Sequence, residues 1–262
     1  MNYVNIEIAA GLATVKLNRP EARNALCIQM MEELRDTARK LQTNTDVHAV
    51  ILCADGPFSA GADLAENAFA GGETPPTKLE LREFLKLGPD MCKAWEDVEA
   101  YTVAAIEGYC VGGASALASA LDYRVCGESA FFRLPEIPLG INMSWNTIPR
   151  LVAQIGPART KEYVIFGKRV TAQDALAWGL CEQVVADGDS LSAAQGLAEE
   201  ILALPPIAVR MTKQSVNATA YALANATSFM DRDQYMLAVQ TQDFAESVSA
   251  FMEKRKPRFK GD

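Results

Sequence analysis

The chain has 262 residues, of which 49% are hydrophobic and 22% charged, and its formal net charge is −8. This composition is typical of a globular protein with a large core, and it excludes fibrous repeats and intrinsic disorder. A general nucleic-acid binder would be basic, and no apolar run approaches the ~20 residues that a bilayer-spanning helix needs. We therefore expect neither a nucleic acid nor a membrane among its partners.

The N-terminal residues and the cysteines indicate a compartment. The segment MNYVNIEIAAGL lacks the basic stretch and apolar core that mark a signal peptide. The six cysteines are scattered without a CxxC pair, which favours reduced thiols over a zinc site or a disulfide framework. We predict a cytoplasmic protein with no metal site.

The first elements are a hairpin and a helix. Apolar residues alternate over 4–8, Ala10 and Gly11 can turn the chain, and a second apolar run covers 12–17. Residues 25–42 then carry apolar side chains at helical spacing, and Asn24 can act as the N-cap of this helix.

Strands and helices then alternate. Short apolar runs at 47–52, 102–106 and 123–126 predict buried strands, and helical patterns, such as that over 81–100, lie between them. This alternation predicts an α/β fold. From residue 189 the pattern is almost wholly helical, so we predict an α/β core over 1–188 and a helical region over 189–262.

Several catalytic classes are excluded by what the chain lacks. The one histidine, His48, lies at the start of a predicted strand, and there is no GxSxG motif, so a histidine-dependent triad is disfavoured. GxGxxG and GxxxxGK[ST] are also missing, so neither dinucleotide nor NTP binding is indicated. No cluster of side chains has metal-ligand spacing.

Two glycine-bearing segments remain as candidates for chemistry. Residues 58–64 follow one predicted strand, and residues 108–115 lie between another strand and a helix. Small residues let backbone approach a ligand closely, and free N–H groups at a helix start attract negative charge. Each segment alone is typical of a tight turn. Together they can direct two backbone N–H groups at one oxygen, as in an oxyanion hole.

These two segments belong to an ordered set. In order and spacing, from end to end, the set resembles the crotonase family, also called the enoyl-CoA hydratase/isomerase family. The matching segments are 18–26 (NRPEARNAL), 58–64 (FSAGADL), 108–115 (GYCVGGAS), 134–140 (LPEIPLG), 172–180 (AQDALAWGL), 205–213 (PPIAVRMTK) and 250–255 (AFMEKR).

The resemblance implies a fold, a substrate and an assembly. The family fold is a spiral of ββα units that form two roughly perpendicular sheets, followed by a helical C-terminal trimerisation region. Its members bind acyl-CoA thioesters and stabilise an enolate-like anion. Coenzyme A is then part of the substrate, so no separate cofactor is expected. The implied assembly is a homotrimer or a dimer of trimers.

The resemblance also assigns site residues. The backbone N–H groups of Ala62 and Gly113 match the oxyanion hole. The C-terminal basic cluster, residues 254–260, is typical either of a solvated helix end or of an anion-binding patch; the resemblance favours the latter, with Phe251 and Lys254 near the nucleotide of coenzyme A. The other residues expected along the substrate are Ala22, Arg23, Ala60, Asp63, Leu64 and Gly112.

The acid/base positions depart from the hydratase pattern. Hydratases of this family carry two glutamates in the site; the first position falls on Ala116 here, whereas the second is retained as Glu136. Ser144 and Trp145 replace small residues at the border of the acyl pocket. Trp145 either fills core volume or shapes that pocket.

A single carboxylate suits a 1,3-proton shift, so the resemblance together with Glu136 predicts an isomerase-type reaction on an enoyl-CoA. One alternative is an enoyl-CoA hydratase, or a hydratase/lyase of an aromatic or branched enoyl-CoA. Another is a non-catalytic acyl-CoA-binding member of the family.

Overall fold

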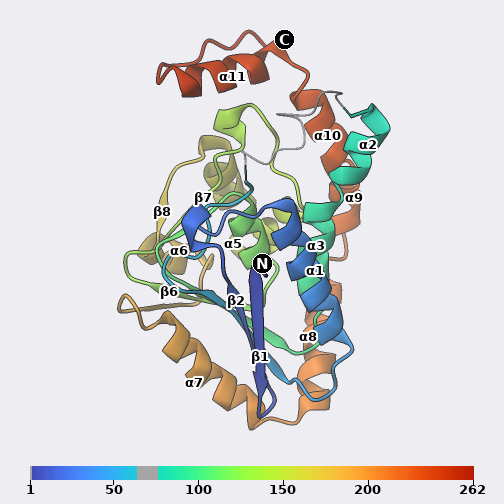
Figure 1. The fold of residues 1–262 in the computed structure, drawn as a ribbon, viewed down its shortest axis with the longest axis vertical. Helices are drawn as coiled ribbons and strands as arrows, with labels where there is room; N and C mark the ends of the chain where they lie inside the picture. The colour runs from blue at the N-terminus through green and yellow to red at the C-terminus, as the bar shows by residue number, and fades with distance from the viewer. Residues whose placement is uncertain (1, 64–75) are drawn as a thin grey trace.

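The structure is a computed structural model, which describes residues 2–63 and 76–262. Within them, strands form a larger and a smaller sheet, helices cover both, and the last helix, α11, lies apart from the sheets (Figure 1). This arrangement confirms the predicted α/β fold with two sheets and C-terminal helices. No helix in this part of the chain is long and apolar enough to cross a membrane.

The larger sheet begins with the predicted hairpin. Ala10 and Gly11 form its turn with φ of 48° and 85°, and the first strand pairs antiparallel with the second. All later pairings in this sheet are parallel, so helices connect its strands. The strand order is β1 (Val4–Ala9), β2 (Leu12–Leu17), β3 (Ala49–Ala54), β4 (Tyr101–Ile106), β6 (Tyr123–Gly127) and β9 (Gln183–Val185).

The smaller sheet lies beside the glycine segment 108–115. It contains β5 (Tyr109–Val111), β7 (Phe131–Arg133) and β8 (Val170–Thr171), with β5 and β7 parallel and β7 and β8 antiparallel. Because β5 leads directly into α4 (Gly113–Ser119), this sheet fixes the position at which α4 begins.

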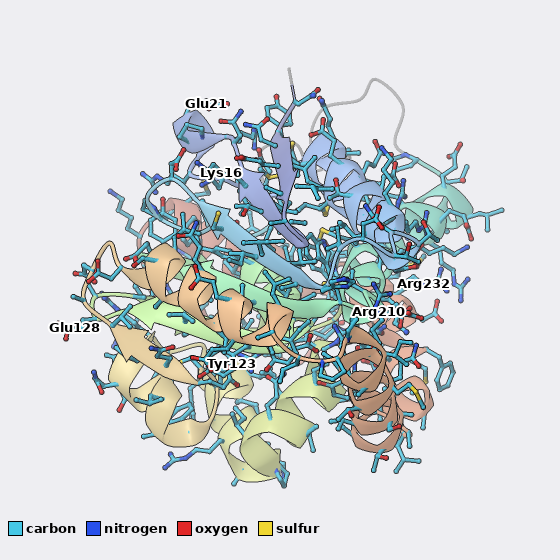
Figure 2. The ribbon with its side chains drawn as sticks, turned by 90° about the horizontal axis from the view of Figure 1, so that it is seen from below. Lys16, Glu21, Tyr123, Glu128, Arg210 and Arg232 are labelled. Carbon is cyan, nitrogen blue, oxygen red and sulfur yellow. The ribbon has the colours of Figure 1, made fainter. Side chains whose placement is uncertain are left out.

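Helices pack on both faces of the larger sheet. On one face, α1 (Ile28–Gln42) packs against α3 (Leu87–Glu96), and the fully buried Trp95 lies in this layer. On the other face, α7 (Ser190–Leu202) crosses the strands (Figure 2) and packs Ala194 and Ala198 into a second apolar core.

The remaining helices connect the strands or follow them. Near the N-terminus and the site these are η1 (Pro20–Ala22), α2 (Lys78–Phe84), η2 (Ile137–Leu139), α5 (Thr147–Phe166) and α6 (Ala172–Trp178). The C-terminal ones are α8 (Pro206–Ala220), α9 (Ala224–Ser228), α10 (Asp231–Ala238) and α11 (Gln242–Met252). Since α7 shares a core with the sheet, the division of the chain at residues 188 and 189 stays a prediction.

Helix α1 begins three residues later than its apolar pattern predicts. It starts at Ile28 and is capped by the Cys27 side chain, so the predicted N-cap Asn24 was wrong. Asn24 instead accepts a hydrogen bond from the Arg19 N–H (2.9 Å) and donates one to the Pro57 carbonyl (3.0 Å). Its side chain therefore joins two loops and is not available to cap a helix.

Candidate active site

Backbone pairing joins the two glycine segments. The Ser59 N–H donates to the Tyr109 carbonyl at 3.0 Å, and the Val111 N–H donates back to the Ser59 carbonyl at 3.2 Å. These bonds form a short parallel bridge between Ser59 and Cys110. The segments therefore run side by side, as an oxyanion hole built from both of them requires.

Gly61 lets the segments approach closely. Its φ is +88°, and a Cβ at this position would lie 2.3 Å from the Val111 carbonyl oxygen and 3.3 Å from the Gly113 nitrogen. No other residue type fits this contact. It places Ala62, the next residue, near the start of α4 at Gly113.

The N–H groups of Ala62 and Gly113 are available to a ligand. Both residues line one cavity, and no acceptor on the described residues takes a hydrogen bond from either N–H. Gly113 is also the first residue of α4, where the unpaired N–H groups give a positive potential. The two groups suit an oxygen that becomes negative during a reaction.

The cavity beside these N–H groups has a volume of about 130 Å³. An engineered apolar cavity of about 150 Å³ binds benzene, so the space suits an acyl group of a few carbons. Most of its wall is apolar and comes from α1, the end of α2, α3 and neighbouring loops, including Leu26, Ile28, Met31, Phe84, Leu87 and Met143.

Glu136 lies on the polar side of this cavity. It follows β7 and precedes η2, and its Oε1 lies 2.9 Å from where a Cβ on Gly112 would stand, so Gly112 makes room for the carboxylate. The Oε2 atom is buried and receives no hydrogen bond from the described residues. Desolvation by burial raises the pKa of Glu136 to about 7, against weaker lowering by a backbone hydrogen bond and by Arg133.

Trp145 closes the cavity near the N–H groups of Ala62 and Gly113. A Cβ at Gly88 would lie 2.1 Å from its indole ring, and a Cβ at Gly113 would lie 2.4 Å from it. The indole therefore fits between α3 and α4 because both helices have glycine there. Ala116 is fully buried, one turn beyond Gly113 on the same face of α4, and is not among the cavity-lining residues.

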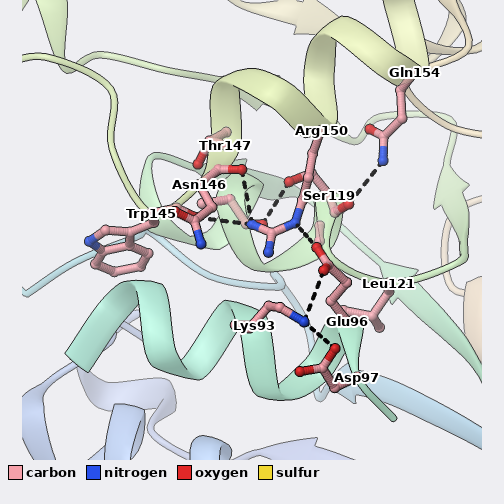
Figure 3. Close-up of polar contacts among 12 residues, drawn as sticks. Lys93, Glu96, Asp97, Ser119, Leu121, Trp145, Asn146, Thr147, Arg150 and Gln154 are labelled. Atoms are coloured by element: carbon pink, nitrogen blue, oxygen red, sulfur yellow. Dashed lines mark hydrogen bonds and ion pairs between the residues drawn. The ribbon is translucent and has the colours of Figure 1, made fainter. Parts of the chain in front are cut away.

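The backbone at Trp145 is strained and strongly held. Trp145 and Asn146 have φ of 62° and 57°, a left-handed conformation that costs roughly 1–2 kcal/mol for each non-glycine residue. Arg150 Nη1 donates to both of their carbonyls, at 2.9 and 3.2 Å, and Arg150 Nε donates to Glu96 at 2.7 Å (Figure 3). These charge-assisted bonds offset the strain.

Asp63 and Ser144 also line the cavity. The Asp63 carboxylate pairs with Arg19 at 2.6 Å, so Glu136 is left as the carboxylate suited to exchange a proton in the described lining. Ser144 anchors its turn, because its carbonyl accepts from the Thr147 hydroxyl at 2.6 Å.

Three of the predicted CoA-lining residues, Ala22, Arg23 and Ala60, lie outside the cavity wall. The Arg23 carbonyl accepts from the Ala60 N–H at 3.1 Å, and Ala22 is next to it in η1, so these three residues lie together beside the oxyanion segment. Leu64 lies outside the described residues. Contact of this group with a ligand stays a prediction.

Comparison with known proteins identifies the family. The family profile described as Enoyl-CoA hydratase/isomerase matches residues 7–262. The chain belongs to this family, the crotonases. Among similar proteins are crotonyl-CoA hydratase of Syntrophomonas wolfei, 32% identical over 265 residues that cover 99% of each chain, and 2,3-dehydroadipyl-CoA hydratase of Escherichia coli, 32% identical over 94% of this chain and 93% of that one.

Solved crotonase structures agree with the fold. The crystal structure of enoyl-CoA hydratase from Bacillus anthracis matches with a TM-score of 0.78 and 30% identity, covering 99% of this chain and all of that one (100%). An enoyl-CoA hydratase/isomerase from Pseudoalteromonas atlantica matches with a TM-score of 0.86 and 25% identity, covering 98% and 100%.

Two predicted residues of this crotonase lie away from the cavity. Phe251 is on α11 with 66% of its surface exposed, and Lys254 follows the helix, also exposed. Neither lines the cavity, and α11 packs instead against η2. Their assigned contact with the nucleotide of coenzyme A stays a prediction.

Sequence reasoning did not assign several residues that line the cavity, among them Gly88, Arg232 and Tyr235. Gly88 lies inside a helix, where an isolated glycine signals close packing and could have been noticed. Arg232 and Tyr235 come from α10, and no local pattern indicates that this helix returns to the site. In the part of the chain that the structure describes, no three His, Cys, Asp or Glu side chains gather as metal ligands.

The raised pKa of Glu136 generates the first prediction. If the ionised carboxylate removes a proton, kcat/KM should rise with pH and reach half its maximum near pH 7, where Glu136 titrates. Glu136→Gln should lower kcat about 10²-fold or more and leave acyl-CoA affinity nearly unchanged. Steady-state kinetics from pH 5.5 to 8.5 on an enoyl-CoA would measure both effects.

Glu128, an exposed carboxylate at the periphery (Figure 2), provides the matched control. Glu128→Gln should keep the wild-type rate and pH profile. Near-normal turnover in Glu136→Gln would exclude this carboxylate from the mechanism.

Proposed function

We propose that this crotonase catalyses a proton shift between the 3-enoyl and 2-enoyl forms of a short acyl-CoA thioester. The observation that carries the proposal concerns the described lining of the cavity: Glu136 is its one carboxylate without an ion pair to a basic side chain, and it lies beside two backbone N–H groups that no described acceptor takes. The position of a second glutamate is taken by Ala116, which is buried and outside the cavity lining.

Each step uses a group already in place. The Glu136 carboxylate removes a proton from the carbon next to the thioester of a 3-enoyl-CoA. The electron pair moves into a dienolate, and the Ala62 and Gly113 N–H groups stabilise its oxygen; loss of one such donor typically costs about 2.7–4 kcal/mol of transition-state stabilisation. Glu136, now protonated, returns the proton to the carbon two positions away and is ionised again. A pKa of about 7 suits both transfers.

Hydration is the second candidate, because the relatives at about 30% identity are mostly named as enoyl-CoA hydratases, including one for crotonyl-CoA and one for short-chain enoyl-CoA. Hydration by this chain would need Glu136 both to activate water and to deliver the proton. The Trp145 indole also fills space beside Gly113 in which a second carboxylate or a water could otherwise lie.

A panel of thioesters separates the two reactions. Wild-type protein in D2O, given 2-enoyl-, 3-enoyl- and 3-hydroxyacyl-CoA, should interconvert the first two with deuterium uptake and add water more slowly, as followed by mass spectrometry. Hydration as fast as isomerisation would favour the hydratase. Tight binding without exchange would identify a non-catalytic acyl-CoA-binding protein.

Position 116 provides a sharper test. Because the Trp145 indole covers the adjoining face of α4, Ala116→Glu alone should add little hydration and should destabilise the fold. Combined with Trp145→Ala, which removes the indole, it should raise hydration of a short 2-enoyl-CoA about tenfold or more over Trp145→Ala alone, the lower part of the range for general acid/base groups. An equal rate in both would show that the second carboxylate position is not what limits hydration.

We further propose a homotrimer or a dimer of trimers, in which the exposed end of α11 reaches the coenzyme A held by a neighbouring copy. Lys254→Ala should then weaken binding of a CoA thioester about tenfold, the scale of one hydrogen bond to a charged group. The matching pantetheine thioester, which lacks the nucleotide, should bind unchanged. Calorimetry would measure both, and equal loss for the two ligands would indicate a role in folding or assembly instead.

A further inference from the structure

Helix α10 is hydrogen-bonded to the turn that carries Trp145. The Asp231 carboxylate accepts from the Asn146 N–H at 3.0 Å, and the Asn142 amide donates to the Asp231 carbonyl at 3.3 Å and to the Gln234 side chain at 3.4 Å. The same helix lines the cavity with Arg232 and Tyr235. One end of α10 thus contacts both the ligand space and the loop that shapes it.

Asp231 acts on the strained part of this turn. Its acceptor bond holds the N–H of Asn146, whose left-handed backbone directly follows that of Trp145. The carbonyls of both residues are held from the other side by Arg150, which in turn pairs with Glu96 of α3 (Figure 3). Donor and acceptor groups of the turn are therefore both fixed, from two different helices.

The burial of Asp231 indicates that this bond matters. Only 8% of its surface is exposed, and burial raises its pKa to about 6, against weaker lowering by the Asn146 N–H and by Arg150. Arg150, the positive charge that lowers its pKa, is already shared with Glu96 and two carbonyls. A buried carboxylate with so little compensation is costly. Among the described residues, the bond from the Asn146 N–H is the one hydrogen bond that this carboxylate accepts.

We propose that Asp231 is a positioning residue that keeps the Trp145 indole between Gly88 and Gly113 and thereby limits the size of the acyl group that the cavity accepts. Without the bond, the Asn146 N–H loses its acceptor and the turn can relax out of its left-handed conformation. The indole then leaves its slot and the cavity lengthens along α3 and α4. The size limit rests on the proposed acyl-CoA function, whereas the position of the indole does not.

The size limit can be measured by binding alone. Wild-type protein should bind butyryl-CoA in preference to octanoyl-CoA. Trp145→Ala and Asp231→Ala should each shift this preference toward octanoyl-CoA by about tenfold, the scale that a pocket wall imposes on one or two methylenes. Because both changes act through the indole, the double variant should shift it no further than Trp145→Ala does.

Two further variants separate positioning from general stability. Asp231→Asn keeps an oxygen that accepts the Asn146 N–H, so it should retain most of the wild-type preference. Asp233→Ala breaks the ion pair of α10 with Arg82 of α2 (2.7 Å) but leaves the turn intact, so it should not change the preference. If Asp233→Ala changed the acyl-chain preference as much as Asp231→Ala, the effect would be explained by weaker packing of α10 alone. That result would overturn the proposal.

The indole position can be observed without any ligand. The chain has three tryptophans, so 5-fluorotryptophan labelling gives three fluorine NMR signals, and Trp145→Phe assigns one of them. Asp231→Ala should move or broaden the Trp145 signal and leave that of buried Trp95 in place. An unchanged Trp145 signal would overturn the positioning role. A moved signal with unchanged acyl preference would overturn the size limit. If wild type binds neither thioester, the proposed function and the size limit both fail, and the fluorine signals still decide whether Asp231 positions the indole.

Discussion

The site depends on the backbone pairing of two glycine segments from different parts of the chain. One segment follows β3 and the other follows β4, two parallel strands that end at the same edge of the sheet. The missing side chain of Gly61 then lets the segments meet at the Val111 carbonyl. This arrangement leaves two N–H groups that no described residue accepts from, and their direction is set by the strands rather than by mobile side chains. Such donors need no reorganisation when charge develops, which is the condition under which an oxyanion hole is most effective.

Small residues also determine where the Glu136 carboxylate lies. Gly112 leaves room for Glu136, while apolar surroundings and an unpartnered Oε2 keep its proton affinity high. Another part of the cavity lining is the Trp145 indole, which fills space that would otherwise be open and forms an aromatic wall. In the proposed reaction, one side of the cavity exchanges protons and the other excludes water and long chains. A reaction that moves a proton within a short substrate matches this division better than one that needs an ordered water.

Much of this could be predicted from sequence, for identifiable reasons. The hairpin, the buried strands and the helical C-terminal region follow from local periodicity. That Ala62, Gly113 and Glu136 lie around one cavity follows from motifs that keep their spacing, and their roles stay a prediction. The predicted start of α1 was wrong because the Asn24 side chain donates a hydrogen bond to the carbonyl of Pro57, 33 positions away, and so does not cap the helix. Gly88 signals close packing, but neither its partner nor the role of Asp231 was predictable, because both depend on where the turn at Trp145 lies in space. Local patterns carry no information about such a contact between α3, α4 and α10.

The fit of the indole between two glycines also restricts how this chain can change. A side chain at position 88 or 113 cannot be introduced while Trp145 is present, since even a Cβ would overlap the ring. Replacing Trp145 first leaves a void, which is unfavourable but does not create a clash. Mutational paths toward a wider pocket are therefore ordered: the tryptophan must change before either glycine. The reverse order holds for the return. If a side chain has been introduced at position 88, it must be removed before a tryptophan can again occupy position 145.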